Sequence, residues 1–266
     1  MYIYGIEYKI PTQPKKTSID GHNLSRKDQY FRRQIVPDFF DEMEYGSDEE
    51  PLYNQKQIDF IDIELDRIDN GYWFYNNGDA TYITGLHYFY LNYWILENGE
   101  RPDYRDCDRR YFCFQDHCEK SPTIYGVIRA KKRREGATSQ GSADLVKTAI
   151  STERAFCGIV SKTGKDAKNV FLTMVRNGYQ SLPIYLQPRI EDEDSQEKLL
   201  FRKPKDKSKK ANQKIKGKIY KDSKGLGSVI DYRNTQLNSY DSGRLTKALI
   251  EEGGKWPTEV PINDYW

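Results

Sequence analysis

The sequence predicts an α/β protein in which a largely parallel sheet follows an aromatic-rich α+β unit. From residue 105 onward, short apolar runs alternate with amphipathic segments, the β-α-β-α order that gives parallel strands joined by crossover helices. Before that residue, aromatic side chains gather around one helical pattern and one hairpin pattern. We therefore expect an extended arm over residues 1–54, an aromatic-rich subdomain over 55–104 and an α/β domain over 105–266, the last with a charged insertion at 191–225.

The composition narrows the class of protein. Of 266 residues, 37% are hydrophobic and 14% aromatic, including 21 tyrosines, which argues against wholesale disorder. The net charge is only +2, so any affinity for nucleic acid has to come from local clusters of charge. Four cysteines do not make a disulfide framework in a chain of this size and indicate a reducing, intracellular setting. With neither a signal peptide nor a run of about 18 apolar residues, we expect a soluble, cytoplasmic protein without a membrane span.

The N-terminal part contains three predicted elements after a polar arm. Residues 11–54 are rich in Pro, Lys, Asp and Glu and predict an extended or loosely docked segment. The apolar spacing of QKQIDFIDIELDRID (55–69) predicts a helix, and GYWFYNNGDATYIT (71–84) predicts a hairpin around an Asn-Gly turn. GLHYFYLNYWILENG (85–99) predicts a second helix that ends at a glycine cap.

The C-terminal part supplies the expected strands and helices of the sheet. Two apolar runs predict buried strands and two amphipathic segments predict helices: strand 123–129, helix 137–152, strand 155–161 and helix 165–179. At 191–225 an acidic run precedes a lysine-dominated stretch, which is interpreted as a solvated loop or as an arm that contacts phosphates. Two short strand-like pieces follow, at 227–237 and 246–256.

The segment RAKKRREGATS (129–139) has the organisation of a phosphate-binding loop. Such a loop follows a strand, turns its amide N–H groups inward and leads into a helix whose positive N-terminus faces the phosphates. A cation then neutralises the phosphates and a hydroxyl, here of Thr138 or Ser139, binds Mg²⁺. Ala137 occupies the position that usually carries lysine, but four cations precede it, at 131–134. The alternative is a basic strand-to-helix turn that binds no nucleotide.

The paired acids of ALIEE (248–252) form the second candidate element. A strand that ends in two carboxylates, placed beside the strand of the phosphate loop, can hold Mg²⁺ with the first, Glu251, and polarise an attacking water with the second, Glu252. The alternative is a solvated pair at a strand end, which is common in proteins. Cys113, His117 and Cys118 lack the second ligand pair of a zinc site, so ordinary packing is the favoured interpretation for them.

Five blocks in a fixed order give the sequence a family resemblance. They are DNGYWFYNNGDATYITGLHYFYLNYW, CDRRYFCFQDHC, KKRREGATS, FCGIVSKTGKDA and NSYDSGRLTKALIEEGGKW, all within residues 55–266. Together they resemble the N-terminal ATPase region of tailed-phage terminase large subunits, above all those of phages that infect gut Bacteroides-type bacteria. The resemblance implies a P-loop NTPase fold of the RecA/ASCE type, here incomplete.

The resemblance also implies a deviant phosphate loop whose functional cation lies at its beginning. It implies catalytic roles for Glu252, Lys131 and Arg134, and ligation of Mg²⁺ by Thr138 and Glu251, although such motors more often carry Asp at the first acid. The implied contacts with ATP are Lys131, Lys132, Arg133, Arg134, Glu135, Gly136, Ala137, Thr138 and Ser139. By the same resemblance, Lys162 and Thr163 would face nucleotide or DNA.

The implied activity is that of an ATPase motor that moves DNA into a procapsid. The implied partners are double-stranded DNA, the portal protein, the small terminase subunit and further copies of the chain in a ring, in the cytoplasm of an infected bacterium rather than in the mature virion. A complete subunit continues into a nuclease domain, so we expect this chain to be a fragment with an open sheet edge. The alternatives are a helicase-type ATPase and a non-hydrolysing nucleic-acid-binding module built on the 202–224 lysines and the tyrosine-rich surface.

Overall fold

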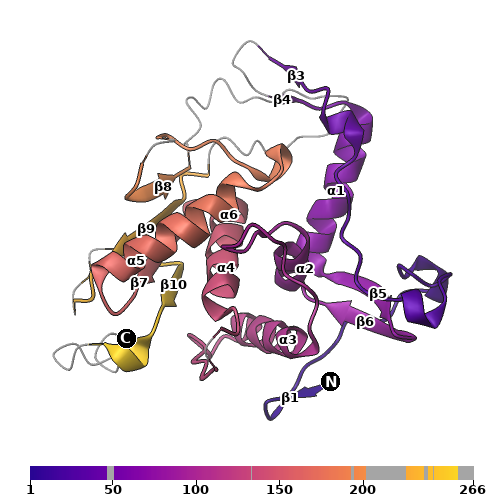
Figure 1. Ribbon diagram of the computed structural model, residues 1–266, viewed down its shortest axis with the longest axis horizontal. Helices are drawn as coiled ribbons and strands as arrows, with labels where there is room; N and C mark the ends of the chain where they lie inside the picture. Colours follow the sequence, from indigo (N-terminus) through magenta and orange to yellow (C-terminus); the bar gives the residue numbers. More distant parts are fainter. Residues whose placement is uncertain are drawn as a thin grey trace. The chain divides into compact units, whose positions relative to one another are not determined.

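The computed structural model divides the chain into two compact units (Figure 1). It describes residues 1–46, 51–132, 134–192, 195–201, 226–236, 239–241 and 243–256. The first unit comprises Met1–Tyr93 and Arg101–Lys131, and the second comprises Trp94–Glu100 and Lys132–Trp266. The sequence places the main boundary after residue 104, whereas in the structure the chain between 105 and 131 belongs to the first unit.

The first unit is built around helix α1 (Gln55–Asn70) and the hairpin of β5 (Tyr72–Asn76) and β6 (Asp79–Ile83), both as predicted. A capping box between Asn54 and Gln57 starts α1, because each side chain accepts a hydrogen bond from the other residue's backbone N–H. The hairpin turns at Asn77 and Gly78, with φ of 50° and 94°. Two successive positive φ values are what a two-residue turn of type I′ requires, which explains the Asn-Gly pair.

Helix α2 (Gly85–Asn92) is shorter than predicted. Thr84 caps it by accepting a hydrogen bond from the backbone of His87, but the helix stops at Asn92 and does not reach Gly99. Gly99 instead closes a turn, with a φ of 82° and its N–H bonded to the carbonyl of Leu96. The predicted helix was too long because the apolar run continues through Trp94, which is buried as part of the second unit instead of extending α2.

The N-terminal arm consists of short elements that dock on the first unit. They are β1 (Tyr2–Ile3), β2 (Ile6–Glu7), three 3-10 turns (Lys16–Ser18, Arg26–Asp28 and Asp38–Phe40), β3 (Glu44–Tyr45) and β4 (Pro51–Leu52). Ile3, Tyr8, Ile19 and Phe40 are buried, so the arm contributes apolar side chains to the packing of the unit. Helix α3 (Asp106–Lys120) completes the unit, and Phe112 and Cys113 are among its buried residues.

The second unit contains a four-stranded sheet in the order β10-β7-β9-β8. β7 (Phe156–Val160), β9 (Val229–Arg233) and β10 (Lys247–Ile250) are parallel, and β8 (Lys198–Leu200) lies antiparallel to β9. This confirms a mixed α/β fold with a sheet that is largely parallel. Among the described residues β10 is an edge strand, paired only with β7.

Two helical segments pack against this sheet and against each other. The first is α4 (Ala137–Ser151), and the second runs continuously through α5 (Gly164–Val170), a π-helical segment (Phe171–Arg176) and α6 (Asn177–Gln180). Short 3-10 turns follow at Ile184–Leu186 and at Gly253–Lys255. Both long helices were predicted from the sequence.

The expected strand at 123–129 is wrong. This segment forms no strand, and Tyr125 and Ile128 are 92% and 93% exposed. The backbone N–H and C=O groups of a strand form their hydrogen bonds with a partner strand, and among the described residues no strand pairs with this segment. The paired acids therefore follow a strand that lies beside β7, and not beside a strand of the phosphate loop. Most of the charged insertion, at 193–194 and 202–225, and the residues after 256 lie outside the described part of the chain.

No helix within the described ranges is long and apolar enough to span a membrane.

Candidate functional site

Helix α4 begins at an open turn. Gly136, the residue before the helix, has φ and ψ of 80° and 13° and offers no side chain to cap the first turn, and Arg134 also has a positive φ of 68°. The first intrahelical bond joins Gln140 N to Gly136 O at 2.9 Å. The N–H groups of residues 137–139 thus point out of the helix end, the arrangement that binds phosphates and other anions.

The two candidate hydroxyls in this turn have different surroundings. Ser139 is buried, and its Oγ accepts a hydrogen bond of 2.9 Å from Nε1 of Trp94. Thr138 is only partly buried. The Ser139 hydroxyl is therefore engaged in the interior of the unit, which leaves Thr138 as the better candidate for a metal-bound hydroxyl.

Trp94 supports the first turn of α4, a role that sequence reasoning missed. It is fully buried, and its ring fills the space where a side chain of residue 178 would lie, since a Cβ on Gly178 would come within 2.3 Å of it. Trp94 thus ties the start of α4 to α6. The sequence gives no direct signal for this contact, because Trp94 lies 45 residues before Ser139.

The predicted cations lie at the surface. Lys132 and Arg134 are exposed and belong to the second unit, Lys131 is exposed as the last residue of the first unit, and Arg133 lies outside the described residues. The described cations thus flank Arg133 in the sequence, Lys131 and Lys132 before it and Arg134 after it.

Helix α4 and strand β10 run in opposite directions. Gly141 of the helix lies against Leu249 of the strand, since a Cβ on Gly141 would lie 2.6 Å from the Leu249 side chain. Asp144, three residues later in the helix, pairs at 2.6 Å with Lys247, which lies two residues earlier in the strand. From Gly141 back to Gly136 the helix spans about 7.5 Å, close to the ~6.6 Å of two strand residues. Measured along the strand direction, the open turn at Gly136 therefore lies at the same position as the residues that follow β10, beginning at Glu251.

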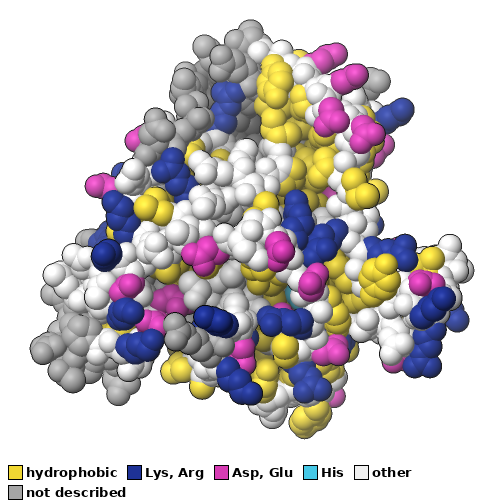
Figure 2. Space-filling model, in the orientation of Figure 1, with side chains coloured by type: hydrophobic (Ala, Val, Ile, Leu, Met, Phe, Trp, Pro, Cys, Tyr) yellow, Lys and Arg dark blue, Asp and Glu magenta, His cyan; other side chains and the backbone are white. Residues whose placement is uncertain are grey.

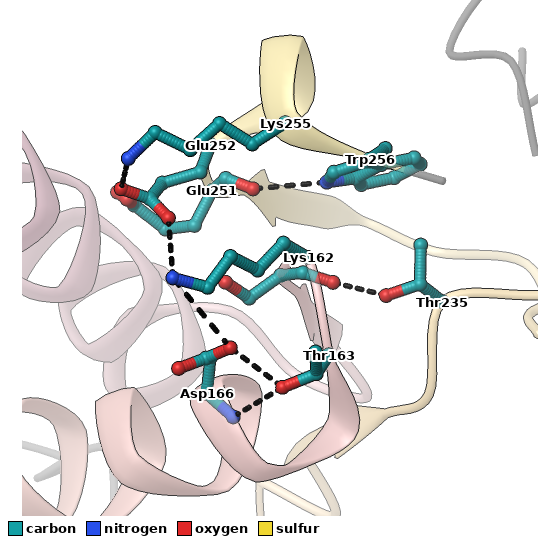
Figure 3. A network of polar contacts seen from close by, with 9 residues as sticks. Lys162, Thr163, Asp166, Thr235, Glu251, Glu252, Lys255 and Trp256 are labelled. Atoms are coloured by element: carbon teal, nitrogen blue, oxygen red, sulfur yellow. Dashed lines mark hydrogen bonds and ion pairs between the residues drawn. The ribbon is translucent and has the colours of Figure 1, made fainter. Parts of the chain in front are cut away.

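Glu251 extends the ladder of β10 by one residue. Its N–H donates to the carbonyl of Val160 at 2.8 Å, and its own carbonyl accepts a bond of 3.0 Å from Nε1 of Trp256. These two contacts fix the point at which the chain leaves the sheet, and Figure 3 shows the one with Trp256. The half-buried side chain of Glu251 thus starts from a defined position at the carboxyl end of the strand.

Glu252 lies in a network of charges just beyond the sheet (Figure 3). Its two carboxylate oxygens contact Lys162 Nζ at 3.1 Å and Lys255 Nζ at 2.5 Å, and its backbone has a φ of 51°. The bonds from Lys255 and from Lys162 hold the pKa of this carboxyl below its usual value, and the bond to Glu252 raises the pKa of Lys162. Glu252 is therefore an ionised carboxylate at neutral pH, about one third exposed to solvent.

The loop after β7 brings Lys162 to this carboxylate. Thr163 caps the following helix by accepting a bond of 3.2 Å from the backbone N–H of Asp166, whose carboxylate also lies 3.9 Å from Lys162. A Cβ on Gly164 would come within 1.6 Å of Asn234, so the close approach of the loops after β7 and β9 requires glycine there. The Lys162–Glu252 pair was not predicted, because the two residues are far apart in the sequence.

A depression of about 430 Å³ lies at the carboxyl end of β9, lined by Tyr232, Arg233, Asn234, Gln236 and Ser239. In open α/β sheets, ligands bind outside the carboxyl ends of the strands. The turn of α4, the paired acids and this depression all belong to that edge of the second unit.

The candidate site offers oxygen atoms as metal ligands. Among the described residues, no three His, Cys, Asp or Glu side chains are grouped so that they could hold an ion. Mg²⁺ commonly binds proteins through one or two oxygen ligands together with substrate phosphates. The Thr138 hydroxyl and the Glu251 carboxylate are oxygen donors of this kind.

All four cysteines are thiols, and burial raises the pKa of Cys113 to about 11.

No protein-family model matches the chain, and no curated protein matches it either.

Proposed function

We propose that this chain is the ATPase motor portion of a phage DNA-packaging terminase large subunit, with its second unit a P-loop NTPase of the RecA/ASCE type. One feature carries the proposal. The N-terminus of α4 has no side-chain cap, and the register of α4 on β10 places it near Glu251 and Glu252, the two consecutive acids at the carboxyl end of that strand. This combination offers separate groups for phosphate, for metal and for water.

The first turn of α4 would hold the phosphates of ATP. The N–H groups of residues 137–139 supply fixed donors, and the exposed cations before them supply charge. Lys131 is the phosphate-sensing cation by resemblance, with Arg134 as the second. When bound, Mg²⁺ would neutralise charge on the β- and γ-phosphates. Thr138 and Glu251 are the residues that would hold it.

Glu252 would orient the attacking water. Each carboxylate oxygen accepts more than one hydrogen bond, so Glu252 can contact water while Lys162 and Lys255 remain bound to it. Its lowered pKa makes it a weak proton acceptor in the ground state. Orientation of the water is therefore its main contribution.

The order of two lysine substitutions tests the nucleotide site. Lys131→Ala should weaken Mg·ATP binding to the intact subunit about tenfold more than Lys132→Ala, because the resemblance assigns the phosphate contact to Lys131 and not to Lys132. Isothermal titration with ATP measures both affinities, and Lys56→Ala on α1 serves as the matched control. The reverse order would move the phosphate-sensing role away from Lys131, and equal affinity of all variants would contradict a phosphate loop.

The proposed partners and setting follow the family: double-stranded DNA, the portal protein, the small terminase subunit and a homo-oligomeric ring, in the cytoplasm of the infected host. A helicase-type ATPase would use the same groups, and a second RecA-like domain in the downstream coding sequence would favour it over a nuclease domain. A non-hydrolysing nucleic-acid-binding module predicts DNA affinity that survives loss of the phosphate loop and falls steeply with salt.

A further inference from the structure

The N-terminal arm separates its charges along the sequence. Residues 9–33, here called the basic arm, carry seven basic side chains against the two acidic ones of Asp20 and Asp28. The basic side chains are Lys9, Lys15, Lys16, Arg26, Lys27, Arg32 and Arg33. Residues 34–50 carry seven acidic side chains and no basic one. The basic arm is thus strongly positive in a chain whose net charge is only +2.

Backbone hydrogen bonds hold the basic arm against the β5–β6 hairpin. Tyr75 N donates to the carbonyl of Asp20 at 2.8 Å, and Asn77 N donates to the carbonyl of Gln29 at 2.9 Å. Arg26 Nε donates to the carbonyl of Asn77 at 2.8 Å, and Ile19 is 1% exposed. The basic arm therefore presents its charges on a fixed scaffold within the first unit.

The side chains of three lysines of the basic arm take no part in holding it there. Lys15, Lys16 and Lys27 are exposed, and none of the described side chains forms an ion pair or hydrogen bond with them. Arg33, in contrast, donates to the carbonyls of Leu91 and Pro102. Figure 2 shows Lys and Arg side chains gathered over the segment that Figure 1 draws in indigo beside β5 and β6. These unpaired charges are available to a polyanion.

An exposed aromatic residue accompanies the charges. Tyr30 is 56% exposed, and the guanidinium of Arg32 lies 5.1 Å from the centre of its ring. Aromatic rings and guanidinium groups stack on nucleobases, whereas an inorganic anion makes no stacking contact with an exposed ring. The ring and the lysines together favour nucleic acid over a simple inorganic anion.

We propose that the basic arm is a nucleic-acid-binding surface that contacts the phosphate backbone through Lys15, Lys16 and Lys27. The contact is independent of base sequence, because phosphate contacts carry no sequence information. This surface does not depend on the proposed ATPase, since all of its residues belong to the first unit. It also differs from the lysine-rich stretch at 202–224, which is a separate candidate.

A triple variant tests the surface in the 266-residue chain. Lys15→Gln/Lys16→Gln/Lys27→Gln should weaken binding to a short random-sequence DNA single strand about tenfold or more at low salt, and should lower the slope of log K against log [salt] by about 2. Fluorescence anisotropy at several salt concentrations measures both quantities. The control variant Lys56→Gln/Lys120→Gln/Lys198→Gln removes the same charge from exposed positions elsewhere and should leave the slope unchanged.

Several outcomes would overturn the proposal. One is an unchanged slope in the arm variant, and another is an equal loss in both variants, which would indicate a general charge effect. A third is loss of self-association without loss of DNA binding, which would assign the basic arm to the acidic residues 34–50 of a second copy. Sedimentation at low salt measures that self-association. Mg·ATP affinity, measured in parallel, should not change in the arm variant, so failure here is separate from failure of the ATPase proposal.

Discussion

Glu64 in the first unit and Glu252 in the second each pair with a cationic side chain but have opposite surroundings. Glu64 is fully buried and bonded to Arg67 at 2.5 Å, to the Tyr88 hydroxyl at 2.6 Å and to the hydroxyl of Tyr93. Glu252 also has cationic partners, but it lies at the sheet edge with about one third of its side chain exposed. A carboxylate whose contacts are all internal stabilises the fold, whereas one that remains open to solvent can also serve a ligand.

The largest expected effect is on the stability of the first unit. Glu64→Gln should lower the free energy of unfolding by about 3 kcal/mol, because it removes the buried negative charge that pairs with Arg67. Urea denaturation measures the change. Glu252→Gln is the matched control and should stay within about 1 kcal/mol of the wild type, as expected for partly exposed ion pairs. Equal losses in the two variants would break the comparison.

The next effect is a sensitivity of the first unit to acid. His87 is fully buried and stacks with the rings of Tyr104 and Phe112, and neither of its ring nitrogens has a partner among the described residues. Burial, and then the charges of Arg109 and Arg105, lower the pKa of His87 to about 3. The unfolded chain binds a proton near pH 6.5 and the folded chain does not, so stability is complete above that pH and is lost as the pH falls toward 3.

Replacing His87 with a ring that cannot titrate isolates this effect. In His87→Phe, the loss of about 1.4 kcal/mol per pH unit below pH 6.5 should disappear, while stacking on Phe112 is retained. Urea denaturation at pH 7, 6 and 5 measures the slope, and His22→Gln, at an exposed position, should keep it. If His87→Phe has the same pH dependence as the wild type, His87 is not the titrating group.

The smallest expected effect sharpens the comparison within the second unit. Trp94→Phe keeps most of the ring but removes the hydrogen bond to Ser139, so it should cost about 1 kcal/mol of stability. Because Ser139 lies in the first turn of α4, this variant should also bind ATP more weakly. Trp73→Phe in β5, whose indole has no such bond in the described structure, should not weaken ATP binding. If the two variants bind ATP equally, Trp94 is a core residue only.

Local patterns predicted the elements, and long-range contacts explain where prediction failed. The helix at 55–70, the Asn77–Gly78 turn and the strands β7 and β10 depend on periodicity or on turn chemistry within a few residues, and each was predicted. The segment 123–129 has the apolar character of a strand but lacks a partner, which its own sequence cannot reveal.

The candidate site shows the same division. The open turn before α4 and the two acids after β10 were predicted from short motifs. The Trp94–Ser139 bond and the Lys162–Glu252 pair join residues 45 and 90 positions apart, so only the folded chain brings them together. These contacts decide which hydroxyl faces inward and which carboxylate is held ionised.

Hydrolysis by Glu252→Gln in the intact subunit tests the central claim most directly. The substitution removes the charge that would orient the attacking water but leaves the α4 turn unchanged. The variant should therefore bind Mg·ATP with wild-type affinity and release phosphate about 10² to 10⁴ times more slowly. Glu197→Gln, at an exposed position before β8, is the control and should hydrolyse normally. Wild-type turnover by Glu252→Gln, or no binding of ATP by the wild-type subunit, would contradict the account.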